Sequence, residues 1–247
     1  ALLRAVMRDR GGVRIDHILG LLRLWTVPRG ARKGEGAYLR YPLQDLLRLL
    51  AIESWRHRAI VIGEDLGVVP PGIRAELSRR GVMGMDVLMF TRDRDGHFLP
   101  PSQWRTDAVA TTTTHDLPTL IGWRGSIDTA WRQRMGLLKL GQYARDVAGR
   151  DADVTALVQA VDAAGFELPD TPAAWRAFTA ASPAPLALLP AEDAMQLEEQ
   201  PNLPGTVEGH PNWRRRLPGI AGDAALDARL VSFHRARHRI SKADTDV

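Results

Sequence analysis

Three acidic side chains lie within two residues of the end of a short run of apolar or threonine residues. These acids are Asp16 after residues 12–15, Glu64 after residues 60–63, and Asp116 after residues 109–114. Each run is rich in β-branched residues and is typical of a β-strand. Because ligands of parallel α/β proteins bind at the carboxyl ends of strands, we expect the three acids to converge on one site.

Carboxylates at strand ends suit glycosyl transfer with retention of configuration. One carboxylate attacks the anomeric carbon and a second donates a proton to the leaving oxygen, which requires the two groups to lie about 5 to 5.5 Å apart. The third carboxylate can hold sugar hydroxyls while positive charge develops on the ring.

Neighbouring residues indicate how the roles divide. Arg14 lies two residues before Asp16, on the same strand face, and would keep that carboxylate ionised. Glu64 follows an apolar strand, and a carboxyl group partly withdrawn from water keeps its proton more readily, which suits a proton donor.

The same residues also have structural interpretations. An Asp or Glu at a strand end can cap the next helix or form an ion pair, and each of the three acids taken singly fits that role about as well. Asp65 could orient its loop while Glu64 reacts. His17 and His115 could be ordinary hydrogen-bonded histidines.

The order of the elements predicts an α/β fold with a parallel sheet. We expect five strands, near residues 13, 60, 87, 110 and 196, the third over residues 85–90 and the last over residues 195–197. Pro42 opens a helix whose apolar stripe should pack on the sheet, formed by Leu43, Leu46, Leu47 and Leu50. A long helix is expected over residues 128–147, and residues 28–36 form a glycine-rich loop.

Five strands are too few for a closed (β/α)8 barrel, which needs eight. We therefore expect a partial barrel with additional helices. Residues 1–247 form one portion of a catalytic barrel in this interpretation, with no separable second domain, because no long linker divides the chain.

Composition argues against several classes of protein. The net charge is +4 and the pI is about 9.9, but arginines are scattered among acids, so a nucleic-acid partner is only a third hypothesis. No apolar run approaches the roughly 20 residues that span a membrane, so no membrane role is expected. The chain has no cysteine, which is consistent with a reducing compartment and a cytoplasmic location.

Four ordered motifs resemble the 4-alpha-glucanotransferase family (amylomaltase, or disproportionating enzyme), relatives of the alpha-amylases. They are residues 14–17 (Arg-Ile-Asp-His), 63–67 (Gly-Glu-Asp-Leu-Gly), 114–119 (Thr-His-Asp-Leu-Pro-Thr) and 202–206 (Asn-Leu-Pro-Gly-Thr). Residues 36–42 and 211–215 are similar to the family too, so the resemblance covers nearly the whole chain.

The resemblance implies a role for each site residue. Asp16 would be the nucleophile that forms a covalent β-glucosyl intermediate, Glu64 the general acid and then base, and Asp116 the stabiliser of the transition state. The residues implied in substrate binding are Arg14, His17, Tyr38, Arg40, His115 and Asn202. The implied substrates are maltooligosaccharides and α-1,4-glucans, with no metal and no organic cofactor.

The resemblance begins just before what would be the fourth strand of the family's barrel, so the chain looks like its C-terminal part. An open sheet exposes two unpaired edges and an apolar face, and we expect self-association through it. We expect little or no activity from the chain alone, because positioning a glucan needs the missing walls. The competing hypothesis is an inactive glucan-binding or interaction fragment.

Overall fold

The computed structural model describes residues 1–32, 34–219 and 222–238. Two compact units make up the chain: the first is Ala1–Met85 with Asp107–Val109, and the second is Asp86–Thr106 with Ala110–Val247. Among the described helices, none combines the length and apolar character needed to cross a bilayer. The prediction of a single barrel portion without a separable domain stays a prediction.

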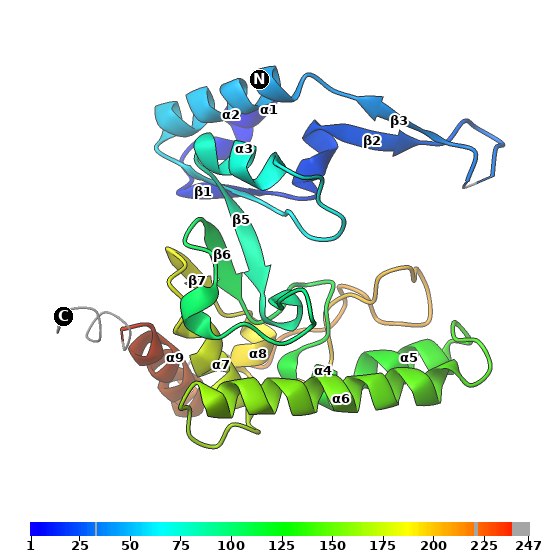
Figure 1. The fold of residues 1–247 in the computed structure, drawn as a ribbon, viewed down its shortest axis with the longest axis vertical. Coiled ribbons are helices and arrows are strands. Elements are labelled where there is room, and N and C mark those ends of the chain that lie inside the picture. Colours follow the sequence, from blue (N-terminus) through cyan, green and yellow to red (C-terminus); the bar gives the residue numbers. More distant parts are fainter. Residues whose placement is uncertain (33, 220–221, 239–247) are drawn as a thin grey trace. The chain divides into compact units, whose positions relative to one another are not determined.

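The first unit contains short strands covered by helices (Figure 1). Its elements are α1 (Leu2–Met7), β1 (Gly12–Ile15), β2 (Arg23–Thr26), β3 (Ala37–Arg40), α2 (Leu43–His57), β4 (Ile60–Gly63) and α3 (Ile73–Arg79). A 3-10 turn, Ile18–Leu21, follows β1 after Asp16 and His17. Strands β5 (Val82–Val87) and β6 (Ala108–Thr111) each contain residues of both units.

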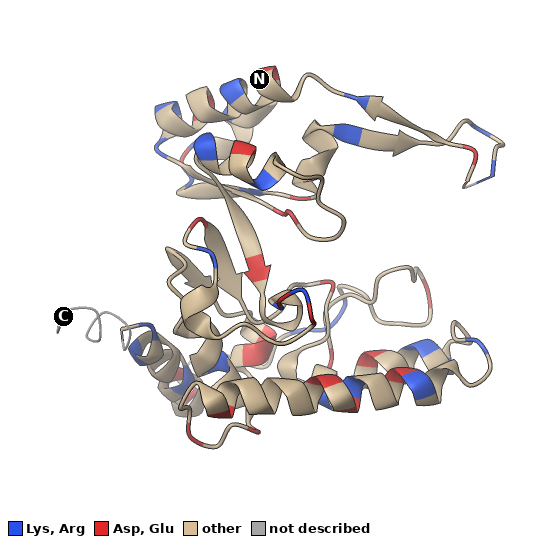
Figure 2. Cartoon of the chain, viewed as in Figure 1, with Lys and Arg blue, Asp and Glu red and all other residues tan. Residues whose placement is uncertain are grey.

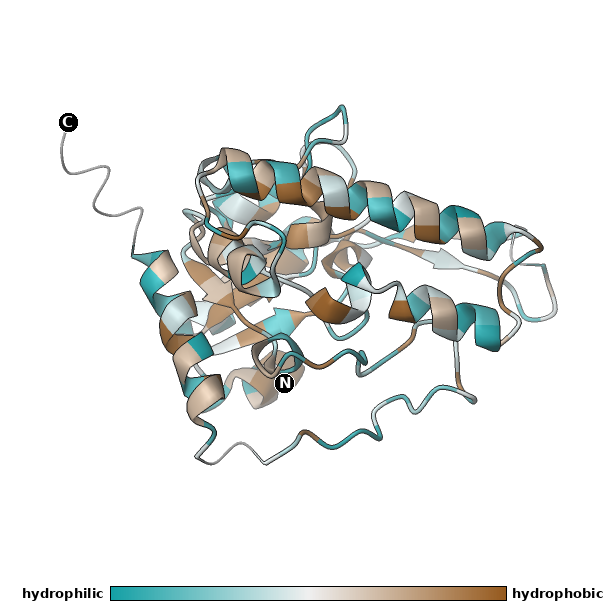
Figure 3. Ribbon diagram, turned by 90° about the horizontal axis from the view of Figure 1, so that it is seen from below, coloured by the Kyte–Doolittle hydropathy of each residue, from teal (hydrophilic) through white to brown (hydrophobic). Residues whose placement is uncertain are grey.

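The second unit is mostly helical. It contains α4 (Leu120–Arg124), α5 (Ile127–Arg134), α6 (Gln142–Ala163), α7 (Pro172–Ala180), β7 (Leu186–Leu188), α8 (Ala191–Ala194) and α9 (Ala224–Arg237), with 3-10 turns at Leu88–Phe90 and Pro101–Gln103. Charges of both signs are mixed along α6 (Figure 2), and hydrophobic and hydrophilic residues alternate there (Figure 3). The scattered charge expected from the sequence is thus seen on this helix.

The main sheet has the order β1-β4-β5-β6-β7. Strand β4 pairs in parallel with both β1 and β5. The spatial order repeats the chain order, as in a singly wound barrel, whereas a doubly wound sheet reverses direction at a switch point. The predicted α/β class with five strands is confirmed.

Each unit has its own apolar core. In the first unit, Leu47 and Leu50 of α2 are almost fully buried and pack with Val61 of β4, which confirms the predicted stripe for these two leucines. In the second unit, Trp175 and Phe178 of α7 are fully buried.

The fifth strand was predicted at the wrong place. Strand β7 covers Leu186–Leu188, and residues 195–197 belong to the turn after α8. The backbone amide of Met195 donates to the Ala191 carbonyl at 2.8 Å, and that of Leu197 donates to Glu192 at 2.9 Å. These helix-like hydrogen bonds occupy the backbone amides of Met195 and Leu197, which pairing with a neighbouring strand would require.

Two further predictions are corrected, and one pair of strands was not predicted. The strand expected over residues 85–90 is β5, Val82–Val87, followed by a 3-10 turn. The helix expected over residues 128–147 is broken between α5 and α6, where Gly136 and Gly141 have φ of 67° and 70°. Strands β2 and β3 form an antiparallel hairpin that the sequence did not reveal, because their side chains are largely exposed.

Gly63 ends β4 directly before Glu64, and its lack of a side chain is a packing requirement. A Cβ atom there would lie 2.8 Å from Cγ1 of the buried Ile18 and 3.1 Å from Val82 Cγ1. We predict that Gly63→Ala lowers the free energy of unfolding by about 1 to 3 kcal/mol through overpacking. Urea unfolding of the chain measures this change.

Gly11→Ala is the matched control, because a Cβ atom at Gly11 meets nothing within 4 Å. Equal unfolding midpoints for the two variants would contradict the tight contact between Gly63 and Ile18.

Candidate functional site

Asp16 and Glu64 lie beside each other at the carboxyl ends of two paired strands. The register pairs Arg14 with Ile62 and Ile15 with Gly63, so the next residue of each strand is an acid. The Glu64 amide continues the ladder by donating to the Ile15 carbonyl at 2.9 Å. Strand pairing therefore places the two acids together, as the sequence predicted.

Arg14 bridges both carboxylates. One terminal nitrogen of its guanidinium lies 2.9 Å from Asp16 Oδ1, and the other lies 2.9 Å from Glu64 Oε2. The planar fork of arginine suits such a double contact, which a lysine could not reproduce. Arg14 thus fixes the orientation of both acids relative to their strands.

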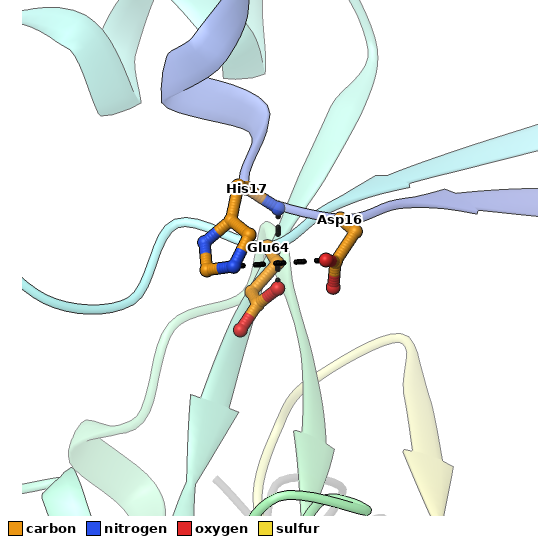
Figure 4. Close-up of side chains that lie close together, drawn as sticks. All are labelled: Asp16, His17 and Glu64. Carbon is orange, nitrogen blue, oxygen red and sulfur yellow. Dashed lines mark hydrogen bonds and ion pairs between the residues drawn. The ribbon is translucent and has the colours of Figure 1, made fainter. Parts of the chain in front are cut away.

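His17 turns the chain immediately after the acid pair (Figure 4). Its backbone is left-handed, with φ 45°, and its amide donates to Glu64 Oε2 at 3.2 Å. Its ring nitrogen Nε2 lies 3.6 Å from Asp16 Oδ2. Left-handed backbone is uncommon for residues other than glycine and recurs at functional sites.

The two carboxylates differ in their access to water. The side chain of Asp16 is 59% exposed, whereas that of Glu64 is 14% exposed. A hydrogen bond with the Glu64 side chain is the largest influence that holds the pKa of Asp16 below its usual range, and Arg14 adds to it against partial desolvation. Asp16, the more exposed acid, is therefore held ionised.

The spacing of the pair favours a retaining mechanism. Ligand atoms of Asp16, His17 and Glu64 all lie within 4.8 Å of one another. Inverting enzymes separate their carboxyl groups by about 6.5 to 9.5 Å to admit a water, while retaining enzymes use about 5 to 5.5 Å. The nearest oxygens of Asp16 and Glu64 therefore lie closer together than the inverting separation.

Two groups of side chains in the described residues have ligand atoms close enough for a metal ion. The first is the trio of Asp16, His17 and Glu64, whose carboxylates already bind Arg14. The second is Asp93, Asp95 and His97 on an exposed turn, where Asp93 Oδ1 accepts the amides of Asp95 and His97, both at 2.9 Å. Protein groups thus already contact the carboxylates of Asp16, Glu64 and Asp93.

The third predicted acid, Asp116, belongs to a separate group in the second unit. Asn202 donates from its side-chain amide to Asp116 Oδ1 at 2.6 Å, and His115 Nε2 lies 3.4 Å from Asp116 Oδ2. The structure therefore brings together His115 and Asp116 of one predicted motif and Asn202 of another. Convergence of this group with Asp16 and Glu64 stays a prediction.

A cavity of about 710 Å³ opens beside His115. Its lining includes Trp213, Glu198 and Arg215, and the ring of Trp213 lies 5.4 Å from that of His115. The Trp213 amide donates to the Pro201 carbonyl at 2.9 Å, which ties the residue to the loop of Asn202. The sequence interpretation used the segment with Trp213 for the resemblance but gave this residue no role.

Tyr38 and Arg40 lie on β3 of the hairpin. The Tyr38 ring packs edge-on against Trp25 at 5.0 Å, and the Arg23 guanidinium lies 4.2 Å above it. Both Tyr38 and Arg40 are exposed. Their assignment to substrate binding rests on the resemblance, and the contacts recorded for Tyr38 are within the hairpin.

The helix-capping alternative does not describe the three acids. The cap residues of the next helical segments are His17, Gly72 and Thr119, and only the Thr119 side chain accepts a capping hydrogen bond. The ion-pair alternative does apply to Asp16 and Glu64, through Arg14. Asp65 has contacts that orient its loop, because it is buried and accepts the Met85 amide at 2.8 Å and Arg74 Nε at 2.7 Å.

Sequence reasoning missed Asp193 in the second unit. Asp193 is buried and accepts hydrogen bonds from residues on either side of the His115–Asp116 segment. A Glu-Asp pair at the start of a short helix was the only signal in the sequence, and such pairs are common on protein surfaces. Only the tertiary structure reveals this contact.

The order of the parallel sheet is that of part of a (β/α)8 barrel, and the Arg14-bridged acid pair lies at the carboxyl ends of two of its strands. The profile of the 4-alpha-glucanotransferase family matches residues 1–221, and the chain belongs to this family.

Relatives and a solved structure agree with this membership. The chain is 35% identical to 4-alpha-glucanotransferase of Mycobacterium tuberculosis, over 96% of this chain and 34% of the relative. It is 33% identical to that of Haemophilus influenzae, over 96% and 36%. The crystal structure of amylomaltase from Corynebacterium glutamicum superposes with a TM-score of 0.81 at 30% identity, covering 98% of this chain and 36% of that one. The chain thus spans about a third of the length of the relatives it matches.

The ionisation of Asp16 can be tested through Arg14. We predict that Arg14→Met raises the pKa of Asp16 towards its ordinary value, because the variant loses the guanidinium charge and hydrogen bond. The lowered pKa contributes stability at pH values above the unfolded pKa, and this contribution is lost as the pH falls through the folded pKa. Carbon-13 NMR titration of the Asp16 carboxyl group measures the change.

Arg92→Met is the control, because Arg92 pairs with Asp153 in the other unit. An Asp16 titration that is unchanged in Arg14→Met would show that Arg14 does not hold this carboxylate ionised.

Proposed function

We propose that the chain supplies the catalytic carboxylates of a 4-alpha-glucanotransferase acting on maltooligosaccharides and other α-1,4-glucans. The observation that carries the proposal is the Arg14-bridged pair, with oxygens of Asp16 and Glu64 within 4.8 Å, in a chain of this family. Family membership supports the proposed substrate class, and the pair supports the choice of the reacting atoms.

In the first half of the proposed reaction, an Asp16 oxygen attacks the anomeric carbon of the donor glucan. The bond from that carbon to the glycosidic oxygen breaks, and Glu64 gives its proton to the departing 4-oxygen. The hydrogen bond with Glu64 and the contact with Arg14 hold Asp16 ionised for attack, and Glu64, the other acid of the pair, is the proposed proton donor. The product is a glucosyl ester on Asp16 and a shortened glucan.

In the second half, the 4-hydroxyl of another glucan replaces the leaving group. Glu64 removes the hydroxyl proton, the oxygen attacks the anomeric carbon, and the ester bond to Asp16 breaks with retained configuration. Transfer prevails over hydrolysis only where the acceptor excludes water from the ester. The chain therefore needs bound sugar on the acceptor side.

Asp116 has the proposed role of holding ring hydroxyls as the anomeric carbon becomes positive. Asn202 and His115 both contact its carboxylate, so the group is already ordered without sugar. Tyr38, Arg40 and His17 remain proposed substrate contacts.

The activity of the 247 residues by themselves is proposed to be small. Strands β1 and β7 stand at the two ends of the sheet order, and exposed strand edges favour pairing with another chain. Self-association, the absence of a nucleic-acid partner and a cytoplasmic location remain proposals. An inactive glucan-binding fragment is the alternative, and it predicts sugar binding without transfer in any context.

A fusion protein tests the proposal, because it also supplies the part of the relative that residues 1–247 do not cover. The matching segment of the Mycobacterium tuberculosis relative is replaced by residues 1–247, and maltotriose is the substrate. We predict release of glucose together with longer glucans, and a loss of at least about a thousand-fold in Asp16→Asn, because the nucleophile is removed. Chromatography of the products measures both.

Asp45→Asn is the matched control, since Asp45 is an exposed acid paired with Arg48 on α2. Full activity of Asp16→Asn would refute the nucleophile assignment. A folded fusion that binds maltoheptaose but transfers nothing would favour the glucan-binding alternative.

A further inference from the structure

Asp193 on α8 is a buried carboxylate that the proposed reaction does not use. It is 2% exposed. Its Oδ1 accepts the Leu120 backbone amide at 2.7 Å, and its Oδ2 accepts the Thr113 hydroxyl at 3.1 Å and also the Thr112 hydroxyl. A buried carboxylate is costly unless such donors surround it, so these bonds are specific features of the fold.

The donors to Asp193 lie on both sides of one short segment. Thr112 and Thr113 precede residues 114–119, and Leu120 follows them. This segment contains His115 and Asp116. One carboxylate therefore holds the two ends of the segment that presents them.

The chain that follows Asp193 contacts the same segment at two more places. The Thr119 hydroxyl donates to the Glu198 carbonyl at 3.1 Å, and Asn202 donates to Asp116 at 2.6 Å. A Cβ atom on Gly122 would lie 2.3 Å from the Glu198 carbonyl oxygen, so α4 approaches this chain closely. Residues 193–202 thus form a brace along residues 112–122.

The brace is anchored in the interior by Arg176 of α7. Arg176 is 5% exposed, and its guanidinium donates to the Asp193 backbone carbonyl at 3.4 Å. Burial, the largest influence, raises the pKa of Asp193, while its hydrogen bonds and the charge of Arg176 oppose this. The pKa of Asp193 is therefore higher in the folded than in the unfolded chain. As the pH rises from the unfolded towards the folded pKa, the free energy of unfolding falls.

We propose that Asp193 is a positioning residue, which fixes the His115–Asp116 segment so that Asp116 meets the reacting sugar in one orientation. The inference rests on the proposed function, because that function gives Asp116 its role. Asp193 does not touch substrate in this proposal. It acts through Thr112, Thr113 and Leu120.

Three variants test the proposal in the chain and in the fusion described above. Asp193→Ala removes both acceptor oxygens. Asp193→Asn keeps the shape, since its amide oxygen can accept the Leu120 amide and its NH2 can donate to hydroxyls that turn. Asp86→Ala is the matched control, because Asp86 also accepts a backbone amide and a side chain, both from Arg105, at 3.0 and 2.7 Å.

Amide hydrogen exchange of the chain is the first readout. We expect Asp193→Ala to speed exchange in residues 114–120 at least about ten-fold, while Asp86→Ala leaves this segment unchanged and Asp193→Asn restores most of the protection. We also expect Asp193→Asn to unfold at a midpoint no lower than that of the parent at neutral pH, because no buried charge remains.

Kinetics of maltotriose transfer by the fusion is the second readout. We expect kcat to fall at least about ten-fold in Asp193→Ala with KM changed less than about three-fold, and Asp193→Asn to recover most of kcat. This split between kcat and KM, with rescue by the isosteric variant, is not expected from a general loss of stability.

Equal exchange of residues 114–120 in Asp193→Ala and the parent would overturn the proposal, and so would an unchanged kcat. If Asp193→Ala does not fold, Thr113→Val removes a single donor and is judged by the same exchange criterion. If the parent fusion shows no transfer, the proposed function fails, and hydrogen exchange still decides whether Asp193 holds the segment.

Discussion

The double ion pair of Arg14 with Asp16 and Glu64 is the interaction on which the candidate site depends. It exists because β1 and β4 pair in parallel with a register that ends both strands at an acid. A shift of one residue in that register would turn one of the acids to the opposite face of the sheet. The backbone at this strand end is fixed by the close packing of Gly63 against Ile18 and by the left-handed turn at His17.

In the second unit, a buried carboxylate and uncharged hydrogen-bond donors hold the candidate site residues in place. There the segment with His115 and Asp116 is not continued by a strand, so side chains hold it. Asp193 binds both its ends, and Asn202 contacts Asp116 directly. Strand pairing itself positions Asp16 and Glu64 in the first unit. In the second unit, residues 193–202 position His115 and Asp116.

Local patterns in the sequence were sufficient for the strand ends and for the leucine stripe of α2. Apolar runs followed by acids predict carboxylates at one edge of a parallel sheet, and Asp16 and Glu64 do lie together there. The strand at residues 186–188 was missed because a strand of three residues, flanked by Pro185 and Pro190, shows little periodicity. Residues 195–197 resembled a strand only in their local sequence. The role of Asp193 depends on contacts with residues about eighty positions away, which no local pattern encodes.

The nucleophile is the central claim, and trapping of the covalent ester tests it most directly. The fusion is treated with a 5-fluoro-α-glucosyl fluoride, whose ring fluorine slows the second step, and is then digested with trypsin. Cleavage after Arg14 and Arg23 gives peptide 15–23, in which Asp16 is the only acidic side chain. Our account predicts a mass increase of one fluoroglucosyl group on this peptide. A label on peptide 59–74, which contains Glu64, or no label on an active fusion, would contradict it.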